Sequence, residues 1–270
     1  QMKQNADKDR VALNGMVFRG GRRMTRAGLF HPDHLAKAKS THVAAWKQVA
    51  RQAAGRSPRP RATVELKSAA EAGWALVFHD TFDRNELGDK WRNVAGTWRI
   101  ENGALHGSGT LLSAVRFPAG DAVGFQRMAF KASAPADASR ISDLSCLLHA
   151  RPIEDPAVAW TNGYFFQFGG KWNSRNRIAR LGQTLVADSS PKTLIVPGKM
   201  HQVVVENNQG QLTLFVDGES VLTVKDDNAL VGEKAGHVGF YFYTPFKVDD
   251  IKVYVKPLPS GLDTDADEVQ

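Results

Sequence analysis

Residues 201–225 read HQVVVENNQGQLTLFVDGESVLTVK, and this stretch decides the fold class. Three runs rich in β-branched and other apolar residues are separated by Asn208-Gln209-Gly210 and by Asp217-Gly218. Short polar segments that end in glycine favour β-hairpin turns, because glycine adopts the positive φ angles that such turns require. The stretch therefore predicts three consecutive antiparallel strands.

The same pattern continues on both sides of this stretch. Residues 97–107, TWRIENGALHG, form a predicted hairpin with Asn102-Gly103 at its turn, and residues 163–170, GYFFQFGG, form a predicted buried strand. Two further β-rich runs, HVGFYFYT at 237–244 and VDDIKVYV at 248–255, lie downstream. Many short strands without intervening helices predict an all-β fold, an antiparallel β-sandwich.

Charge divides the chain more sharply than hydropathy does. We predict a basic arm over residues 1–72, the β-sandwich over 73–258 and an acidic tail over 259–270. The arm holds 15 Lys and Arg against 5 Asp and Glu, a net charge of +10, whereas the rest of the chain holds 20 against 23, a net charge of −3. This asymmetry predicts that the arm meets an anionic molecule or an acidic protein.

Within the arm, composition predicts three segments. Residues 1–30 show no sustained period and are expected to be irregular. Residues 31–56 are rich in Ala, Lys and Gln, which favour a helix, and the Pro/Arg-rich residues 57–62 form a predicted linker. The arm lacks the interleaved aromatic residues of a nucleic-acid stacking platform, so we expect no nucleic-acid partner.

Composition also limits the classes of protein that the chain can belong to. Cys146 is the only cysteine, which excludes an internal disulfide and a cysteine-based zinc site. No apolar run approaches the roughly 18 residues that span a bilayer, so no membrane span is expected. A chain without disulfides fits the cytosol and also a bacterial secreted protein, and we favour a secreted or periplasmic location.

Directly after the aromatic run of residues 163–170, the sequence becomes polar. It contains Trp172, Asn173, Arg175 and Asn176 within five positions. A tryptophan ring suits the apolar face of a pyranose, while Asn and Arg donate hydrogen bonds to hydroxyls or carboxylates. We therefore predict a glycan site at these residues, with His149 as a further candidate. The alternative is that Trp172 packs as a lid while the Arg and Asn side chains bond to neighbouring backbone groups.

Four stretches together resemble the concanavalin A-like, laminin-G-like jelly roll. The first, residues 77–107, carries Phe82, Asp83, Trp91, Trp98, Gly103 and Leu105. The others are the hairpin around Asp217-Gly218, the closing run 236–255, and the middle stretch 163–177 with Asp143 to Cys146, which is similar to bacterial family-16-like and 3-keto-disaccharide-hydrolase-like domains. The resemblance covers residues 74–256 and implies a jelly roll whose concave sheet face and loops recognise a glycan.

The resemblance also implies where catalytic acids would lie. Family-16 enzymes place carboxylates at alternate positions of one strand in an E-x-D-x-x-E pattern, and this chain lacks that pattern. The acid–base residues that remain are Asp143, His149 and Glu206. We therefore expect no catalysis of the family-16 type, and an enzyme built on these three residues would be a glycoside hydrolase or lyase.

Calcium is the metal that the resemblance implies. Related jelly rolls place an Asp at the start of the closing strand, where it joins ligands near the first strand. Asp249 matches that position, Asp250 is adjacent, and Asp80 and Asp83 lie in the partner stretch. Oxygen ligands suit Ca²⁺, so a structural calcium ion is a candidate although no cofactor is required. The alternative is that these acids cap turns or pair with Lys252 and Arg84.

Three functions follow from these observations and stay open at the level of sequence. The first is a non-catalytic carbohydrate-binding module. The second is a glycoside-processing enzyme of the 3-keto-disaccharide-hydrolase-like type. The third is a structural or assembly subunit that its basic N-terminal arm anchors to a partner.

Overall fold

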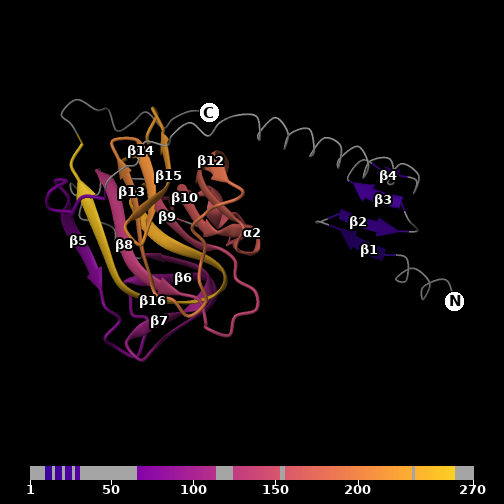
Figure 1. Cartoon of the computed structure of the whole chain (residues 1–270), viewed down its shortest axis with the longest axis horizontal. Coiled ribbons are helices and arrows are strands. Elements are labelled where there is room, and N and C mark those ends of the chain that lie inside the picture. The colour runs from indigo at the N-terminus through magenta and orange to yellow at the C-terminus, as the bar shows by residue number, and fades with distance from the viewer. Residues whose placement is uncertain are drawn as a thin grey trace. The chain divides into compact units, whose positions relative to one another are not determined.

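The computed structural model describes residues 10–13, 16–19, 22–25, 28–30, 66–113, 124–152, 156–232 and 235–258, and for residues 10–30 it describes the backbone only. The chain divides into two compact units, Gln1–Ala62 and Thr63–Gln270 (Figure 1). Among the described residues, no helix combines the length and the apolar character that a membrane crossing requires.

The first unit contains a small antiparallel sheet. Its strands are β1 (Arg10–Leu13), β2 (Met16–Arg19), β3 (Arg22–Thr25) and β4 (Gly28–Phe30), and they pair in sequence order. The sequence predicts an irregular segment over residues 1–30, and the structure differs there. Each strand has only three or four residues, too few for a sustained period, although Asn14-Gly15 and Gly20-Gly21 are dipeptides that favour hairpins.

Three other predictions lie outside the described residues. These are the helix over residues 31–56, the linker over 57–62 and the acidic tail over 259–270.

The second unit is built from twelve strands in one antiparallel sheet that folds over itself (Figure 1). Its strands are β5 (Ala75–Asp80), β6 (Trp91–Glu101), β7 (Ala104–Ser113), β8 (Phe125–Ser133), β9 (Leu144–Ala150), β10 (Tyr164–Gly169), β11 (Arg175–Arg180), β12 (Gln183–Asp188), β13 (His201–Asn208), β14 (Gln211–Val216), β15 (Glu219–Lys225) and β16 (His237–Lys256). Two short helical turns, η1 (Pro156–Thr161) and α2 (Gly170–Asn173), lie on either side of β10.

Strand β16 joins the two layers of the sandwich. Residues 237–242 pair with β9 and β7, whereas residues 248–255 pair with β8 and β5. The first layer therefore has the order β12-β11-β10-β9-β16-β7-β6, and the second has the order β15-β14-β13-β8-β16-β5. Figure 1 shows β16 as the long curved strand that makes this connection. The predicted all-β, antiparallel sandwich is confirmed.

The core between the two layers explains why apolar residues recur at every second position of the strands. Successive side chains of a strand point to opposite faces, so every second residue enters the core. Cys146, Phe166 and Phe240 occupy paired positions on β9, β10 and β16, and all three are buried in the main core. Phe240 contacts the ring of Phe130 from the second layer, with centroids 5.1 Å apart. Each aromatic ring buried in this way stabilises the fold by about 1.5–3 kcal/mol.

The hairpins predicted from turn chemistry are confirmed. Strands β13, β14 and β15 follow one another as antiparallel neighbours, and β6 pairs with β7. The turn at Asp217-Gly218 has φ angles of 54° and 86°, and the turn at Asn102-Gly103 has φ angles of 52° and 68°. Two consecutive positive φ angles match a type I′ turn, whose twist suits the flanking strands.

Candidate functional site

The outer face of the first layer carries a row of polar side chains across four strands. Tyr241 pairs with Ser145, Ser145 with Gln167, and Gln167 with Arg177. Directly paired residues point to the same face of a sheet, and their neighbours Cys146, Phe166 and Ile178 belong to the main core on the other side. We name the surface formed by Arg140, Arg175 and Arg177 with Trp160, Trp172, Tyr241 and Tyr243 the arginine face.

The loop after β10 holds Trp172 in an unusual backbone conformation. Lys171, Trp172 and Asn173 all have left-handed φ angles, between 51° and 60°. Non-glycine residues rarely adopt this region, and such strain persists only where the surroundings fix it. Here Asn173 fixes it, because its Nδ2 donates to the Ile195 carbonyl at 2.8 Å and its Oδ1 accepts from the Ile195 amide at 2.9 Å.

Trp172 and Tyr243 form an exposed aromatic pair at the edge of this face. Their rings lie nearly perpendicular, with centroids 5.6 Å apart, and the two residues are 49% and 59% exposed. The guanidinium of Arg140 lies 4.1 Å from the centroid of the Trp172 ring. Large aromatic side chains exposed together are uncommon on a soluble domain and often mark a contact surface.

Asp143 lies beside this pair and is engaged by neutral donors. Gln167 Nε2 donates to its Oδ1, and Ser142 Oγ donates to its Oδ2 at 3.2 Å. Arg175 Nη2 donates to Gln167 Oε1 at 3.1 Å, so the arginine reaches Asp143 only through the glutamine. Burial raises the pKa of Asp143, although Gln167, Ser142 and the two nearby arginines oppose the increase.

Arg177 is held by rings rather than by hydrogen bonds. Its guanidinium carbon lies 5.1 Å from the ring centroid of Phe165 and 5.7 Å from that of Trp160. Its Nε is buried and has no hydrogen-bond partner. Burial, followed by the charge of Arg175, lowers the pKa of Arg177. This guanidinium is therefore partly desolvated without the polar partners that usually compensate for burial.

Two of the predicted ligand-binding residues have structural partners instead. The Asn173 amide bonds to both polar groups of the Ile195 backbone. Asn176 is fully buried: its Oδ1 accepts from the Gly169 amide at 3.0 Å, and its Nδ2 donates to the Thr193 carbonyl at 3.2 Å. Trp172 and Arg175 are the members of the predicted set that lie on the arginine face.

His149 lies away from this face. Its φ angle is 50°, and the pairing of β9 with β16 shifts register between His237 and Gly239, so the side chain turns towards the interior. There its Nε2 lies 3.1 Å from Asn207 Nδ2. The residue is 1% exposed, and burial lowers its pKa to about 3. His149 is therefore a neutral interior residue.

The alternative catalytic residues do not come together. Asp143 and His149 are six positions apart along the same strand direction, roughly 20 Å at 3.3 Å per residue. Glu206 lies on the outer face of the second layer, because its neighbour Val205 belongs to the core, and it pairs with Arg127 at 3.6 Å. Asp143 and Glu206 thus lie on opposite outer faces of the sandwich. A concerted role for these three residues does not fit this arrangement.

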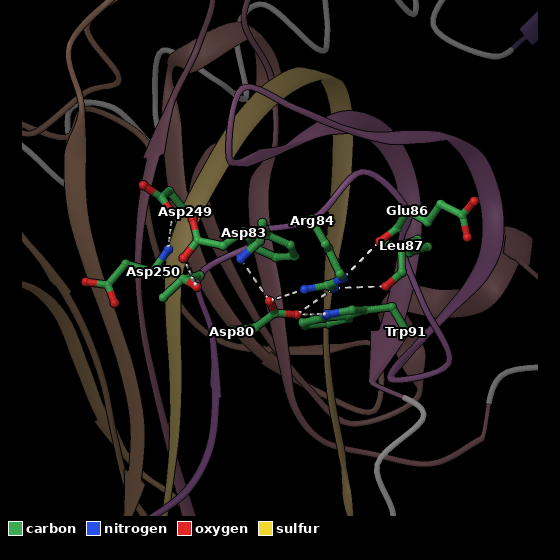
Figure 2. Close-up of polar contacts among 10 residues, drawn as sticks. Asp80, Asp83, Arg84, Glu86, Leu87, Trp91, Asp249 and Asp250 are labelled. Carbon is green, nitrogen blue, oxygen red and sulfur yellow. Dashed lines mark hydrogen bonds and ion pairs between the residues drawn. The ribbon is translucent and has the colours of Figure 1, made fainter.

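The calcium candidates near the first strand are occupied by basic and backbone groups (Figure 2). Asp80 Oδ1 accepts from Arg84 Nη1 at 2.6 Å and from the Phe82 amide at 2.9 Å. Its Oδ2 accepts from Arg84 Nη2 at 2.9 Å and from Trp91 Nε1 at 2.7 Å. Burial raises the pKa of Asp80, but these hydrogen bonds together hold it below its ordinary value. A guanidinium therefore neutralises this carboxylate.

The other calcium candidates also have partners within the protein. Asp250 lies 2.9 Å from His79, 2.8 Å from Lys252 and 3.2 Å from Lys131. Asp249 Oδ1 accepts from the Asp250 amide at 2.7 Å, and Asp83 Oδ2 accepts from Thr81 Oγ1 at 2.6 Å. In the described part of the chain, no three His, Cys, Asp or Glu side chains are grouped to hold a metal ion. As arranged here, these carboxylates suit ion pairs with basic residues better than Ca²⁺, and the calcium site stays a prediction.

Comparison with solved structures identifies the fold. The carbohydrate recognition domain of Emp47p matches with a TM-score of 0.50 at 10% sequence identity, over 71% of this chain and 100% of that domain. The described domain therefore has a jelly-roll fold, as the resemblance implied. No protein-family model and no curated protein matches the sequence.

Other jelly rolls match at similar levels. A protein of unknown function with a galectin-like fold from Bacillus subtilis has a TM-score of 0.49 at 14% identity, over 72% of this chain and 100% of that protein. SCLam, a non-specific endo-β-1,3(4)-glucanase from family GH16, has a TM-score of 0.48 at 12% identity, over 72% of this chain and 95% of the enzyme. At these identities the likeness concerns the fold alone.

Four residues of the arginine face were not among the site residues predicted from the sequence: Arg140, Trp160, Tyr241 and Tyr243. One signal was present for the neighbouring polar row. Gln167 interrupts the aromatic run of residues 164–168, and a single polar residue in a buried strand indicates an outer face with polar neighbours. Arg140 and Tyr243 gave no such signal, because they reach Trp172 only through the pairing of β9 and β16 and the loop that precedes β9.

Proposed function

We propose that the domain is a non-catalytic carbohydrate-binding module that holds a glycan on the arginine face. The observation that carries the proposal is the pair Trp172 and Tyr243, which is exposed although the backbone of Trp172 is fixed in a left-handed turn. A fixed aromatic ring loses little conformational entropy on binding and stacks well on the C–H face of a sugar.

The neighbouring polar groups support the same function. Gln167, Arg175 and Asp143 form a hydrogen-bonded chain beside the aromatic pair, and such groups orient the hydroxyls of a bound sugar. Since Arg140 covers one face of the indole, the sugar is expected to stack on the other. The Emp47p domain shares this fold and is a carbohydrate recognition domain, which adds support.

The test is calorimetry of the full chain against a panel of neutral and acidic oligosaccharides, chosen after a glycan array. Trp172→Ala is expected to weaken binding at least about tenfold, because central aromatic anchors dominate such interfaces. Trp172→Phe keeps a ring and is expected to lose less. Leu76→Ala, at another exposed apolar residue, is the control. A panel without any binding, or equal affinity in Trp172→Ala, would contradict the proposal.

The two other functions remain predictions with their own tests. Asp143 is the acid beside the polar row of the arginine face, so turnover of an oxidised disaccharide that disappears in Asp143→Asn would favour the glycoside-processing enzyme. Turnover that survives Asp143→Asn and His149→Ala would remove these assignments. For the assembly subunit, a 73–270 fragment that stays folded but loses its partner would identify residues 1–72 as the anchor.

A further inference from the structure

The arginine face carries more positive charge than its neighbours compensate. In the described part of the chain, Arg140, Arg175 and Arg177 form no ion pair with a carboxylate. Arg84, Arg127 and Arg180, by contrast, each pair with an acid, at 2.6, 3.6 and 3.1 Å. Arg84, Arg127 and Arg180 thus have carboxylate partners, whereas among the described residues the partly buried Arg175 and Arg177 and the exposed Arg140 do not.

Asp143 compensates for only part of this charge. It is the one carboxylate that interacts with both Arg175 and Arg177 among the described residues, and it does so without a direct ion pair. Burial disfavours the charged form of Asp143, so this carboxylate is a weak source of negative charge for the two arginines. The guanidinium groups of Arg175 and Arg177 therefore share one carboxyl group.

The guanidinium groups of Arg140 and Arg177 lie next to aromatic rings. Arg140 lies over Trp172, and Arg177 lies against Phe165 and Trp160. A guanidinium that contacts a ring through its face keeps its in-plane N–H groups free, and two of these match the spacing of two oxygens of a carboxylate or a sulfate. The Nε atoms of Arg175 and Arg177 are buried and have no hydrogen-bond partner, so the terminal Nη groups are the donors that a ligand could reach.

From this arrangement we infer that the glycan bound on the arginine face is anionic, with carboxylate or sulfate substituents that Arg140, Arg175 and Arg177 recognise. The inference rests on the proposed function and adds the chemical class of the ligand. The sugar ring stacks on Trp172, and the anionic substituents supply the charge that the protein itself lacks at this place.

The experiment titrates the full chain with tetragalacturonate, with a chondroitin sulfate tetrasaccharide and with neutral cellotetraose. The wild-type chain is expected to bind at least one anionic ligand about tenfold or more tightly than cellotetraose, since one charge-assisted hydrogen bond contributes about that factor. Binding of tetragalacturonate would show that carboxylates suffice, and binding of the chondroitin sulfate tetrasaccharide alone, which carries both carboxylates and sulfates, would indicate that sulfate is required. Raising the ionic strength to about 0.5 M should weaken only the anionic ligands.

Variants separate this face from the basic arm, which all forms retain. Arg140→Gln and Arg175→Gln are each expected to weaken the anionic ligand about tenfold and to leave thermal unfolding almost unchanged. Arg175→Lys keeps the charge without the planar fork and is expected to recover part of the loss. Arg99→Gln removes an exposed arginine from β6, four strands away from β10, and is the matched control.

The outcomes distinguish a failure of the inferred anionic ligand from a failure of the proposed glycan binding. Binding of anionic ligands that Arg140→Gln and Arg175→Gln do not change would place them on the arm and overturn the inference. Tighter binding of cellotetraose would also overturn it, while the proposed function would stand. If no glycan binds, the proposed function fails first and the inference fails with it.

Discussion

Arginines on the two outer faces of the sandwich have different kinds of partners. On the second layer, Arg127 lies beside Glu206, with side chains 6% and 10% exposed, and Arg127 Nη2 also donates to the Lys67 carbonyl at 3.1 Å. On the first layer, Arg177 lies between aromatic rings, and Arg175 bonds to a neutral glutamine. The residue type is the same, and the difference lies in whether the protein supplies the countercharge.

This difference separates a structural role from a binding role. A buried ion pair is costly to form, as the raised pKa of Glu206 and the lowered pKa of Arg127 both reflect, and burial is the largest cause of each. Once it is formed, however, removal of one partner leaves an uncompensated charge. An arginine without a countercharge already bears that cost in the free protein, and a ligand can remove it.

The largest expected effect follows from breaking the compensated pair. Glu206→Gln should lower the free energy of unfolding by about 3 kcal/mol, because it leaves Arg127 buried without a charge partner. Denaturant unfolding measures the change. Glu101→Gln, which removes the partner of the exposed Arg99, should change stability by less than about 0.5 kcal/mol. A loss below about 1 kcal/mol for Glu206→Gln would show that the two faces do not differ in this way.

The second prediction has the opposite sign and concerns the other face. Arg177→Met should leave the free energy of unfolding unchanged or raise it by up to about 1 kcal/mol, because a partly desolvated charge is replaced by an apolar chain among rings. Arg127→Met, the matched variant on the second layer, should lower it by about 3 kcal/mol, since Glu206 is then left alone. Equal destabilisation by both variants would mean that Arg177 is a structural residue.

The third prediction concerns pH and is smaller. Burial raises the pKa of Asp143 in the folded state above its value in the unfolded chain. The folded state then binds the proton more tightly, so this residue's contribution to stability falls as pH rises through the raised pKa. The difference in unfolding free energy between wild type and Asp143→Asn, followed from pH 4 to pH 7, should therefore shift against the wild type as pH rises. A difference that is independent of pH would contradict the assignment.

The smallest expected effect concerns calcium. Because Arg84 neutralises Asp80, and His79, Lys131 and Lys252 surround Asp250, Ca²⁺ should shift the midpoint of thermal unfolding by less than about 1 °C relative to a chelator. A bound ion at 100 times its Kd would stabilise the fold by about 2.7 kcal/mol, which is easily measured. A stabilisation of that size would support a calcium ion bound at these carboxylates.

The sequence predicted those parts of the fold that local chemistry determines. Asn102-Gly103 and Asp217-Gly218 fix their hairpins within a few residues, so the turns and the antiparallel layers could be read directly. The four strands of residues 10–30 escaped notice because each is too short to show a period. The spacing of such strands predicted an antiparallel sandwich, and the jelly roll was what the family resemblance implied.

The site was harder to predict because its members meet through long-range pairing. Trp172 and Arg175 were identified from residue type, but the bulge that turns His149 inwards depends on the register between β9 and β16. The roles of Asn173 and Asn176 depend on the backbone of residues 193–195, which lies about 20 positions away in the sequence. Neither relationship leaves a local pattern, so His149, Asn173 and Asn176 all resembled ligand-binding groups in the sequence.

The most direct test of the central claim is the response of individual tryptophans to a glycan. The chain has six tryptophans, and each indole N–H gives a separate NMR signal that single Trp→Phe variants assign. On titration with the tightest-binding oligosaccharide, the signals of Trp172 and Trp160 should move together, while those of Trp74, Trp91 and Trp98 stay in place. Movement of the Trp46 signal alone, or no movement at saturating glycan, would contradict binding on the arginine face.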